Sequence, residues 1–549
     1  MEKSNPSIDP KSGFCSETKI FHSLRPPALL PPETTPLSAA SYALSLQLTS
    51  PWPDSTALIN SATGHRLLYS EFTQKTKTLS ASLQTLVGLS KGHTAFILSP
   101  NSIHVPILYF SLLSLGVVIS PANPTSTESE ISRQIKLSKS VIAFASSTTC
   151  HKLPTDLRYG TILIDSPQFE SMMTSSRSCE ELGRVHVEVS QSDIAAIMYS
   201  SGTTGQVKGV MWTHRNLIAV VAAYYAQRQE RTSPAVLLYT MPYFHAYGFA
   251  FSVKSVALSE TAVVIMERFD LRKMLKAVEE HRVTHVALTP PVVVAMTKGD
   301  LAAGYDLRSL EAVSCGGAPL GRDVIAAFTA KFPPVLLIQG YALTESTGAA
   351  FRPMSPEEGI RWGSVGRIMS NCEAKIIDPD TAVALPPFKQ GELCIKGPII
   401  MKGYVGDAKA TSATLVSDGW LRTGDLCYFD EEGFLFVVDR LKELIKYKGY
   451  QVPPAELEQL LQSHPEIVDA AVIPYPDEEA GQVPMAFVVR HSQSSLDEGQ
   501  VMDFIAKQVA PYKKIRRVKF ASSIPKSAAG KILRKELRNI AIQGTSSKL

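Results

Sequence analysis

The sequence predicts an α/β protein that continues into a β-rich subdomain and a compact α+β unit, and three observations predict this fold class. The chain has 549 residues, beyond the size at which one hydrophobic core stops growing, so we expect two or three domains. From about residue 60 to about residue 340, short Val/Ile/Leu runs alternate with helical periodicity, as in parallel sheets with crossover helices. After about residue 365 the strands become shorter and are separated by Gly and Asp turns.

The alternation can be followed segment by segment. Strand-like and helical runs take turns in the order TAFILSP (94–100), SIHVPILYFSLLSLG (102–116), VVISPA (117–122), ESEISRQIKLSKS (128–140) and VIAFAS (141–146). A second series continues the pattern with AVLLYTMP (235–242), TAVVIMERF (261–269), HVALTPPVVVAM (285–296) and PVLLIQGYALTE (334–345). The strands end in Gly-, Thr- or Pro-rich loops. Because ligands in open α/β sheets collect at the carboxyl ends of strands, we expect the site there.

The later segments predict the other two parts of the fold. The β-rich subdomain is indicated by EAKIID (373–378), GELCIKG (391–397), GWLRTGDLCYFD (419–430) and GFLFVVDRLKE (433–443). A charged stretch then leads into ELEQLLQSHPEIVDAAVIPYP (456–476) and PMAFVVRH (484–491), an α+β unit. We place the boundaries at an extended lead-in 1–40, a large domain 41–440 with its β-rich part from about residue 366, a small domain 441–542 and a flexible tail 543–549.

The most apolar stretch, VPILYFSLLSLGVVISPA at 105–122, approaches the length of a membrane span. Its prolines at 106 and 121, the serines between them and the change from helical to strand-like texture at Gly116 favour a buried helix followed by a buried strand. We therefore expect no transmembrane span.

Composition narrows the class of protein further. The formal net charge is only +4, which gives no indication of nucleic-acid binding. Seven cysteines lie scattered without CxxC or Cys/His spacing, so we expect reduced thiols and no metal site built from them. The first residues lack the apolar core of a secretory signal. These features predict a globular protein in a reducing compartment.

The carboxyl-terminal region carries two local signals. Basic residues crowd into 512–538, by default a solvated face, and they include Lys513, Lys514, Arg516 and Arg517. The last three residues, Ser547, Lys548 and Leu549, spell the peroxisomal address S-K-L, which import receptors read at a chain end. We expect a peroxisomal location and an import receptor as partner.

The loop YSSGTTGQVKG at 199–209 is too polar for a core, yet it lies between a strand and a helix. Glycines let the backbone approach a ligand closely, and hydroxyls with backbone N–H groups can bind phosphate oxygens. Its spacing is not that of a Walker loop, so taken alone it fits a linker better than a phosphate site.

Four companion segments favour the phosphate site. QGYALTES (339–346) offers an aromatic ring for a base, a hydroxyl for a phosphate and a carboxylate for Mg²⁺. WLRTGD ends in Asp425, which can accept hydrogen bonds from both ribose hydroxyls. VDRLKELIKYKG and GKILRK add cations, among them Arg440 and Lys531.

In this order, the five segments resemble the adenylate-forming superfamily of acyl-CoA synthetases, luciferases and carrier-loading adenylation domains, over roughly residues 40 to 540. GELCIKG, GGAPLG (316–321) and KYKGYQVPPAELE look most like plant 4-coumarate:CoA ligases and their peroxisomal ligase-like relatives. The resemblance implies a large N-terminal domain of mixed sheets sandwiched by helices, which binds ATP and the acid, and a small mobile C-terminal cap.

The resemblance also implies the cofactors ATP, Mg²⁺ and coenzyme A and a reaction through an acyl-adenylate. Negative charge gathers on phosphorus in the first step, so positioned cations are the main requirement. Lys531 matches the adenylation lysine, Glu345 the residue that helps to hold Mg²⁺, and Thr344 a catalytic threonine. The ATP- and AMP-binding positions are Ser200, Ser201, Gly202, Thr203, Thr204, Gly205, Lys208, Gly317, Ala318, Gln339, Gly340, Tyr341, Thr344, Asp425, Arg440 and Lys531.

In this family the cap serves two half-reactions by rotating, a lid motion of a kind that often limits turnover. Lys442 matches the hinge of the rotation. Lys446 and Gln451 match catalytic positions of the second face, and Lys448 and Gly449 match coenzyme A contacts.

His245 matches a position between the phosphate loop and the acid pocket, where it would touch the acid or close the coenzyme A tunnel. The expected pocket wall comprises Tyr247, Phe249, Ala250, Val293, Cys315, Gly316, Ala342 and Gly348. True 4-coumarate ligases carry a polar asparagine near Ala250, suited to a phenolic hydroxyl, and an apolar pocket discriminates less strongly. Together with the S-K-L ending, the resemblance points to the peroxisomal ligase-like group and implies medium or long fatty acids, jasmonate precursors or cinnamate-like acids for β-oxidation as substrates.

Other functions share these motifs. A luciferase-like oxygenase has every nucleotide motif, and a cytosolic-type 4-coumarate:CoA ligase would act on a different acid. The complete set of motif residues argues against a binding scaffold, and no carrier segment follows the cap as in a carrier-loading module. We expect a monomer without nucleic-acid partners.

Overall fold

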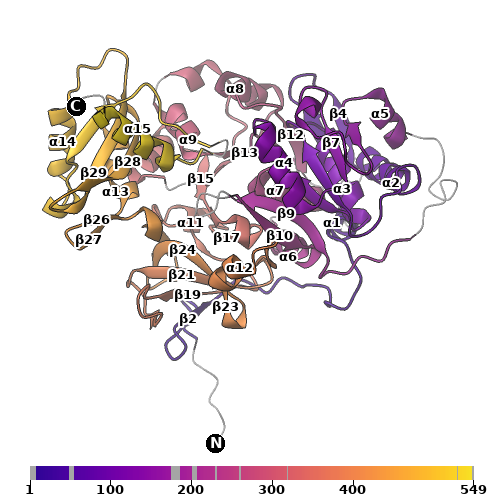
Figure 1. The fold of residues 1–549 in the computed structure, drawn as a ribbon, viewed down its shortest axis with the longest axis horizontal. Coiled ribbons are helices and arrows are strands. Elements are labelled where there is room, and N and C mark those ends of the chain that lie inside the picture. Colours follow the sequence, from indigo (N-terminus) through magenta and orange to yellow (C-terminus); the bar gives the residue numbers. More distant parts are fainter. Residues whose placement is uncertain are drawn as a thin grey trace, which may run out of the picture.

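The N-terminal part of the chain forms two α/β sheets that lie side by side (Figure 1). The computed structural model describes residues 8–47, 55–174, 186–200, 207–228, 231–258, 261–298, 300–317, 320–527 and 530–546. The first sheet has the order β22 (Gly403–Tyr404), β10 (Lys208–Thr213), β9 (Ile194–Ser200), β6 (Val118–Pro121), β5 (Thr94–Leu98), β7 (Ile142–Ala145) and β8 (Thr161–Leu163).

The second sheet has the order β15 (Leu336–Gln339), β14 (Ala312–Cys315), β13 (His285–Leu288), β11 (Ala235–Tyr239), β12 (Thr261–Ile265), β3 (Thr56–Asn60) and β4 (Arg66–Leu68). Its strands pair in parallel except for the β3–β4 hairpin. In the first sheet, β5 to β9 are parallel, and β10 and β22 add antiparallel partners. The predicted α/β texture is confirmed in both series.

Helices cover these sheets because their apolar residues recur at helical spacing. They are α1 (Ala39–Gln47), α2 (Tyr69–Thr85), α3 (His104–Ser114), α4 (Glu128–Ser138), α5 (Pro167–Thr174), α6 (His214–Ala226), α7 (Ala246–Ala257), α8 (Leu271–Glu280), α9 (Pro290–Thr297) and α10 (Arg322–Lys331). The stretch 105–122 forms α3 and β6, joined at Gly116 with φ +65°, as predicted. Among the described residues, no helix is long and apolar enough to cross a membrane.

A β-rich subdomain follows the α/β sheets and is antiparallel. Its sheet contains β1 (Phe14–Cys15), β2 (Ile20–His22), β19 (Glu373–Ile377), β20 (Ala384–Leu385), β21 (Gly391–Lys396), β23 (Leu415–Val416), β24 (Trp420–Phe429) and β25 (Leu435–Arg440). A smaller sheet of β16 (Tyr341–Ala342), β17 (Ala349–Arg352) and β18 (Arg367–Ile368) lies between it and the α/β part, with the short helices α11 (Pro356–Gly359) and α12 (Ala408–Thr414).

The C-terminal domain has its own sheet and lies at one end of the molecule (Figure 1). Its elements are β26 (Ile445–Tyr447), β27 (Tyr450–Val452), α13 (Pro454–Ser463), β28 (Ile467–Asp477), β29 (Gly481–Arg490), α14 (Glu498–Ala506), β30 (Arg517–Phe520) and α15 (Arg534–Ser546). The chain leaves the β-rich sheet at Arg440 and enters this sheet at Ile445. Helix α15 continues past residue 542, where a flexible tail was expected to begin; the S-K-L residues 547–549 lie outside the described part.

The lead-in expected over residues 1–40 is part of the fold from residue 8 onward, which corrects that prediction. Strands β1 and β2 pair as a hairpin, and β2 extends the β-rich sheet by pairing with β19. Phe21 is 1% exposed, and its ring stacks on Phe429 at 3.9 Å between centroids. Proline and serine content concealed this role because the apolar residues that pack are few and widely spaced. The six cysteines of the described chain are free thiols, in keeping with the prediction.

We expect Phe21→Ala to destabilise the large domain by about 3 kcal/mol or more, because it removes a buried ring and leaves a cavity. Urea unfolding followed by intrinsic fluorescence measures the effect. Leu29→Ala is the matched control, since Leu29 is 89% exposed. Equal unfolding midpoints for the two variants would show that the lead-in contributes nothing to stability.

Candidate active site

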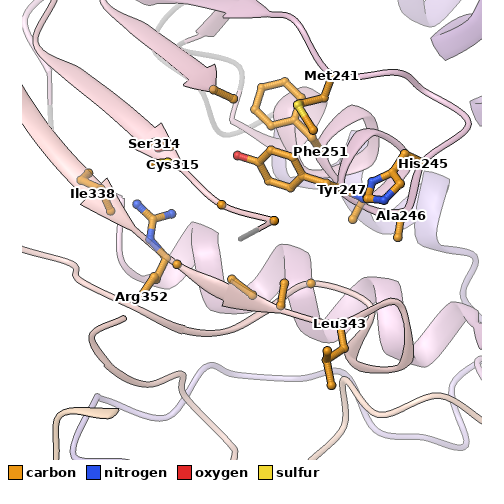
Figure 2. Close-up of a pocket in the computed structure, with 18 of the residues that line it drawn as sticks. Met241, His245, Ala246, Tyr247, Phe251, Ser314, Cys315, Ile338, Leu343 and Arg352 are labelled. Atoms are coloured by element: carbon orange, nitrogen blue, oxygen red, sulfur yellow. The ribbon is translucent and has the colours of Figure 1, made fainter. Parts of the chain in front are cut away.

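A cavity of about 1840 Å³ lies where the α/β sheets, the small β16–β17–β18 sheet and the C-terminal domain meet. Its wall includes the carboxyl ends of strands in both α/β sheets, as predicted, among them Ser200, Leu288 and Cys315. Figure 2 shows Tyr247 and His245 on one side of this space and Arg352 on the other. One end of the wall is rich in charged and hydroxyl groups, and the other is largely apolar.

Glu345 organises the polar end of the cavity. Its Oε1 accepts hydrogen bonds from the Ser200 hydroxyl at 3.3 Å and from the Tyr404 hydroxyl at 3.0 Å. Burial raises the pKa of Tyr404, which keeps it a donor. The ammonium group of Lys208 lies 4.6 Å from the centre of the Tyr404 ring. The end of β9, the start of β10 and the turn at Glu345 are thereby held together around one carboxylate.

The backbone at Thr344 is fixed from the other side. Its carbonyl oxygen accepts a hydrogen bond from Trp212 Nε1 at 2.7 Å, and the Trp212 side chain is fully buried. Ser200, Lys208, Gly317, Gly340, Thr344 and Glu345 all line the cavity, so the structure brings these predicted residues together. Residues Ser201 to Gly205 and Ala318 lie outside the described residues.

Asp425 and Arg440 face each other on neighbouring strands β24 and β25. Arg440 Nε lies 3.0 Å from Asp425 Oδ1, and the Tyr341 hydroxyl donates to Asp425 Oδ2 at 2.5 Å. Burial raises the pKa of Asp425, an effect that the Arg440 charge opposes. Tyr341 is itself buried and does not line the cavity, and neither do Gln339 and Asp425, which is 3% exposed. The predicted adenine-binding ring of Tyr341 therefore supports Asp425 in this structure.

Lys531 reaches the same cavity from the C-terminal domain. Its loop closes on itself: the Ser527 N–H donates to the Lys531 carbonyl at 2.8 Å, and the Lys531 N–H donates to the Ser527 hydroxyl at 3.2 Å. Gly530 has φ +78°, and a Cβ there would lie 3.2 Å from Thr289 of the large domain. Burial, followed by the charges of Arg440 and Lys442, lowers the pKa of Lys531 to about 8. The cavity thus concentrates positive charge.

The C-terminal domain is docked with its Lys531 face toward the cavity. Lys298 at the end of α9 donates from Nζ to the carbonyl oxygens of Gln462 at 2.9 Å and Ile467 at 2.7 Å. Asp439 Oδ2 accepts from the Ala455 N–H at 2.8 Å. These contacts hold the start of the C-terminal domain against the large domain.

The residues predicted to act in the second step do not reach the cavity in this arrangement. Lys446 pairs in register with Gln451 across the β26–β27 hairpin, and both are exposed. Lys448 pairs with Glu479, and Gly449 forms the turn with φ +85°. Lys442 lies in the connection between β25 and β26, and burial lowers its pKa.

Helix α7 supplies one wall of the apolar end. His245 caps its first turn by accepting the Tyr247 N–H on Nδ1 at 3.3 Å, and burial lowers the pKa of His245. Tyr247 and Ala250 line the cavity, as do Cys315, Gly316, Ala342 and Gly348 from other elements. Met241 and Phe251 add apolar surface beside them (Figure 2). This end can hold a hydrophobic group with its reactive end toward Thr344 and Lys531.

Two predicted pocket residues do not line the cavity, which corrects their assignment. Phe249 is fully buried in the core, 4.7 Å from Tyr109 and 5.8 Å from Trp212 between ring centroids. It stands two residues from Tyr247, so helical geometry turns it to the opposite side of α7. Val293 is fully buried among the apolar residues that α9 shares with the second sheet.

Three polar residues of the apolar end carry no motif in the sequence and were not predicted: Tyr224, Lys254 and Arg352. The Lys254 ammonium lies 3.7 Å from the centre of the Tyr224 ring, and the Arg352 guanidinium carbon lies 4.9 Å from it. Lys254 follows Tyr247 by seven residues, a spacing that places both on one helical face and could have revealed it. No spacing in the sequence relates Arg352 to α7.

The position of Lys531 predicts an unusual titration. Its ammonium is charged below about pH 8 and loses the proton as the pH rises through that value. Competitive acetylation across neutral to alkaline pH, read by peptide mass analysis, should show this midpoint, with exposed Lys535 as the control. A bound polyphosphate would favour the charged form and move the midpoint upward. A midpoint equal to that of Lys535 would contradict the buried, cation-rich environment.

Solved structures share this architecture. An ATP-bound MatB from Rhodopseudomonas palustris superposes with a TM-score of 0.83 at 24% identity, covering 92% of this chain and 99% of that one. At this level of identity, the similarity establishes the fold and nothing about activity. An o-succinylbenzoate CoA synthetase from Bacillus subtilis, solved with its acyl-adenylate intermediate, gives a TM-score of 0.75 at 27% identity over 90% and 97% of the two chains. The predicted fold of large and small domains is confirmed.

Sequence comparisons agree with the fold. A 4-coumarate–CoA ligase-like 9 from Arabidopsis thaliana is 52% identical over the full length of both chains. A peroxisomal OPC-8:0-CoA ligase 1 from the same plant is 44% identical over 99% of this chain and 100% of that one. Residues 49–405 match the AMP-binding enzyme family, and residues 456–531 match the AMP-binding enzyme C-terminal domain. The chain therefore belongs to the AMP-binding enzyme family, within the adenylate-forming superfamily.

Proposed function

We propose that this protein is an ATP-dependent carboxylic acid:CoA ligase that acts on a hydrophobic acid in two steps. The observation that carries the proposal is the convergence of Lys531 from the C-terminal domain with Glu345 and Arg440 in one cavity, with the buried Asp425 directly behind Arg440. Cations and a nearby carboxylate around one space suit a bound nucleotide. Ligase names among the relatives support the same reaction.

In the first step, a carboxylate oxygen of the acid attacks the α-phosphorus of ATP, and the bond to the β-phosphate oxygen breaks. Pyrophosphate leaves and acyl-AMP remains. Lys531 would stabilise the charge that gathers on the α-phosphate, and Lys208 would stabilise the departing pyrophosphate. Asp425 would accept hydrogen bonds from the ribose hydroxyls, with Arg440 and Tyr341 orienting its carboxylate.

In the second step, the thiolate sulfur of coenzyme A attacks the acyl carbon, and AMP leaves. The exposed Lys446–Gln451 hairpin would have to replace the Lys531 loop at the cavity, by rotation of the C-terminal domain about the Lys442 connection. The docking bonds of Lys298 to Gln462 and Ile467 would break in that rotation.

A magnesium ion would accompany ATP. Among the described residues, no group of three or more His, Cys, Asp or Glu side chains forms a metal cage, and Glu345 offers a single carboxylate. That fits Mg²⁺, which usually takes one or two carboxylates and fills its other positions with water and phosphate oxygens. The ion would neutralise phosphate charge beside Glu345.

A panel of fatty, cinnamate-like and cyclopentanone-bearing acids tests the proposal, with pyrophosphate release measured and products identified by mass. We expect at least one hydrophobic acid to yield an acyl-CoA when ATP and coenzyme A are supplied. Folded protein that binds ATP but forms no acyl-CoA from any acid would refute the ligase. Light emission or oxygen-dependent loss of CO₂ from the adenylate would instead identify a luciferase-like oxygenase.

The two half-reactions are assigned to two faces of the C-terminal domain, so substitutions on each face should impair different half-reactions. Lys531→Ala should lose adenylate formation by about a hundredfold or more and keep thioester formation from supplied acyl-AMP, because it removes a transition-state cation. Lys446→Ala should show the reverse pattern. Lys535→Ala, on the exposed side of α15, is the matched control. Equal loss of both half-reactions in either variant contradicts the two-face assignment.

We also propose that the protein acts in the peroxisome. The peroxisomal relative and the sequence Ser-Lys-Leu at 547–549 support this location. A fluorescent protein fused ahead of residue 1 should enter peroxisomes in plant cells, and deletion of residues 547–549 should leave it in the cytosol. Peroxisomal fluorescence that survives the deletion would show that another signal directs import.

A further inference from the structure

Two cations stand at the far end of the acid pocket, where a purely hydrophobic substrate would need none. Lys254 and Arg352 both line the cavity, one from α7 and the other from the end of β17. Figure 2 shows the Arg352 guanidinium pointing into the cavity toward Tyr247. Both cations lie against the Tyr224 ring, whose centre is 3.7 Å from the Lys254 nitrogen and 4.9 Å from the Arg352 guanidinium carbon.

No carboxylate within the described residues forms an ion pair with either cation. The acidic groups of the cavity wall are engaged elsewhere: Glu311 pairs with Arg231 at 2.7 Å, and Glu392 accepts from Arg422 Nε at 2.9 Å. Glu345 accepts a hydrogen bond from Tyr404 at the polar end of the cavity, and Asp407 caps α12. Arg352 Nε donates to the Pro353 carbonyl oxygen at 3.3 Å, and Tyr224 is a hydrogen-bond partner of both cations, but these neutral acceptors supply no counter-charge. A cation without a counter-charge is costly to bury unless a ligand supplies one.

The pKa of Tyr224 reflects the positive charge of these two neighbours. Burial acts to raise its pKa, yet the charges of Lys254 and Arg352 outweigh burial and lower the pKa to about 8. Burial in turn lowers the pKa of Lys254, so an acceptor beside its ammonium group would favour the charged form. The site is therefore suited to an oxygen acceptor that a substrate would bring.

The two cations lie further along elements that start in the cavity wall. His245 of the wall caps α7, which begins at Ala246, and β17 begins four residues after Glu345 of the wall. Seven residues of α7 separate Tyr247 from Lys254, a rise of roughly 10 Å along the helix. Three residues of β17 from Ala349 to Arg352 span roughly 10 Å as well. An acid lying along these elements would place its far end between the two cations.

We propose that the acid substrate carries a second oxygen acceptor at its far end, a carboxylate or a keto group, and that Lys254 and Arg352 bind this group. The proposal rests on the ligase function proposed above and specifies its substrate class. Apolar surface from Met241, Phe251 and Ala250 holds the middle of the molecule, and the two ends are recognised by charge. Unsubstituted fatty acids would leave both cations unpaired and bind less well.

Matched sets of straight-chain acids test the proposal: at each of several lengths, a monocarboxylic acid, the corresponding dicarboxylic acid and an acid with a keto group near its far end. At the best length, we expect kcat/KM for acyl-CoA formation to be about tenfold or more higher for an acceptor-bearing acid than for the plain acid. A preference for the diacid identifies an anionic acceptor, and a preference for the keto acid a neutral one. Equal or better use of plain acids at every length overturns the proposal.

Variants test whether Lys254 and Arg352 cause the expected preference for acceptor-bearing acids. Lys254→Met and Arg352→Met replace a cation by a flexible apolar side chain, so they should lower kcat/KM for the preferred acid by about ten- to a hundredfold and remove most of its advantage over the plain acid of the same length. Lys273→Met, on the exposed side of α8, should change neither. An equal loss on all acids in variants with normal circular dichroism would overturn the assignment. Wild-type protein that forms no acyl-CoA from any acid would refute the ligase function itself.

Discussion

The buried pair of Asp425 and Arg440 is the interaction on which the site depends. It joins the last two long strands of the β-rich sheet at the point where the chain leaves for the C-terminal domain. Asp425 is 3% exposed, and its carboxylate is held on both oxygens, by Arg440 and by Tyr341. A buried carboxylate with fixed partners cannot shift without leaving a charge unpaired, so the exit of the chain is anchored.

The Asp425–Arg440 pair also contributes to the electrostatic potential in the neighbouring cavity. Arg440, Lys442 and Lys531 approach one another there, and the pKa of Lys531 falls to about 8 as a consequence of burial and of the other two charges. Asp425 supplies only part of the compensating charge. The remaining positive field is unfavourable for the free protein and favourable for a polyanion such as ATP, which would bring together groups that otherwise repel.

A second region of positive charge lies at the apolar end of the cavity. Its wall is largely apolar, yet Lys254 and Arg352 converge on Tyr224 without an acidic partner among the described residues. The positive charge at each end of the cavity suits an oxygen-rich group: phosphates at one end and, as proposed above, an oxygen acceptor of the substrate at the other. The separation of the ends along α7 and β17 relates the two requirements to the length of the acid.

The sequence by itself determined the alternation of strands and helices and the β-rich segment, and it predicted candidate residues for the polar end of the cavity, because periodicity and short motifs are local properties. Only the tertiary structure decided which side of α7 faces the cavity, so that Phe249 packs in the core while Lys254 lines the pocket. Arg352, the Lys298 contacts and the packing of Phe21 on Phe429 likewise join segments far apart in the chain. The sequence also left the orientation of the C-terminal domain undetermined. The Lys531 motif and the Lys446–Gln451 motif lie on different faces of the domain, and long-range contacts place the Lys531 face at the cavity.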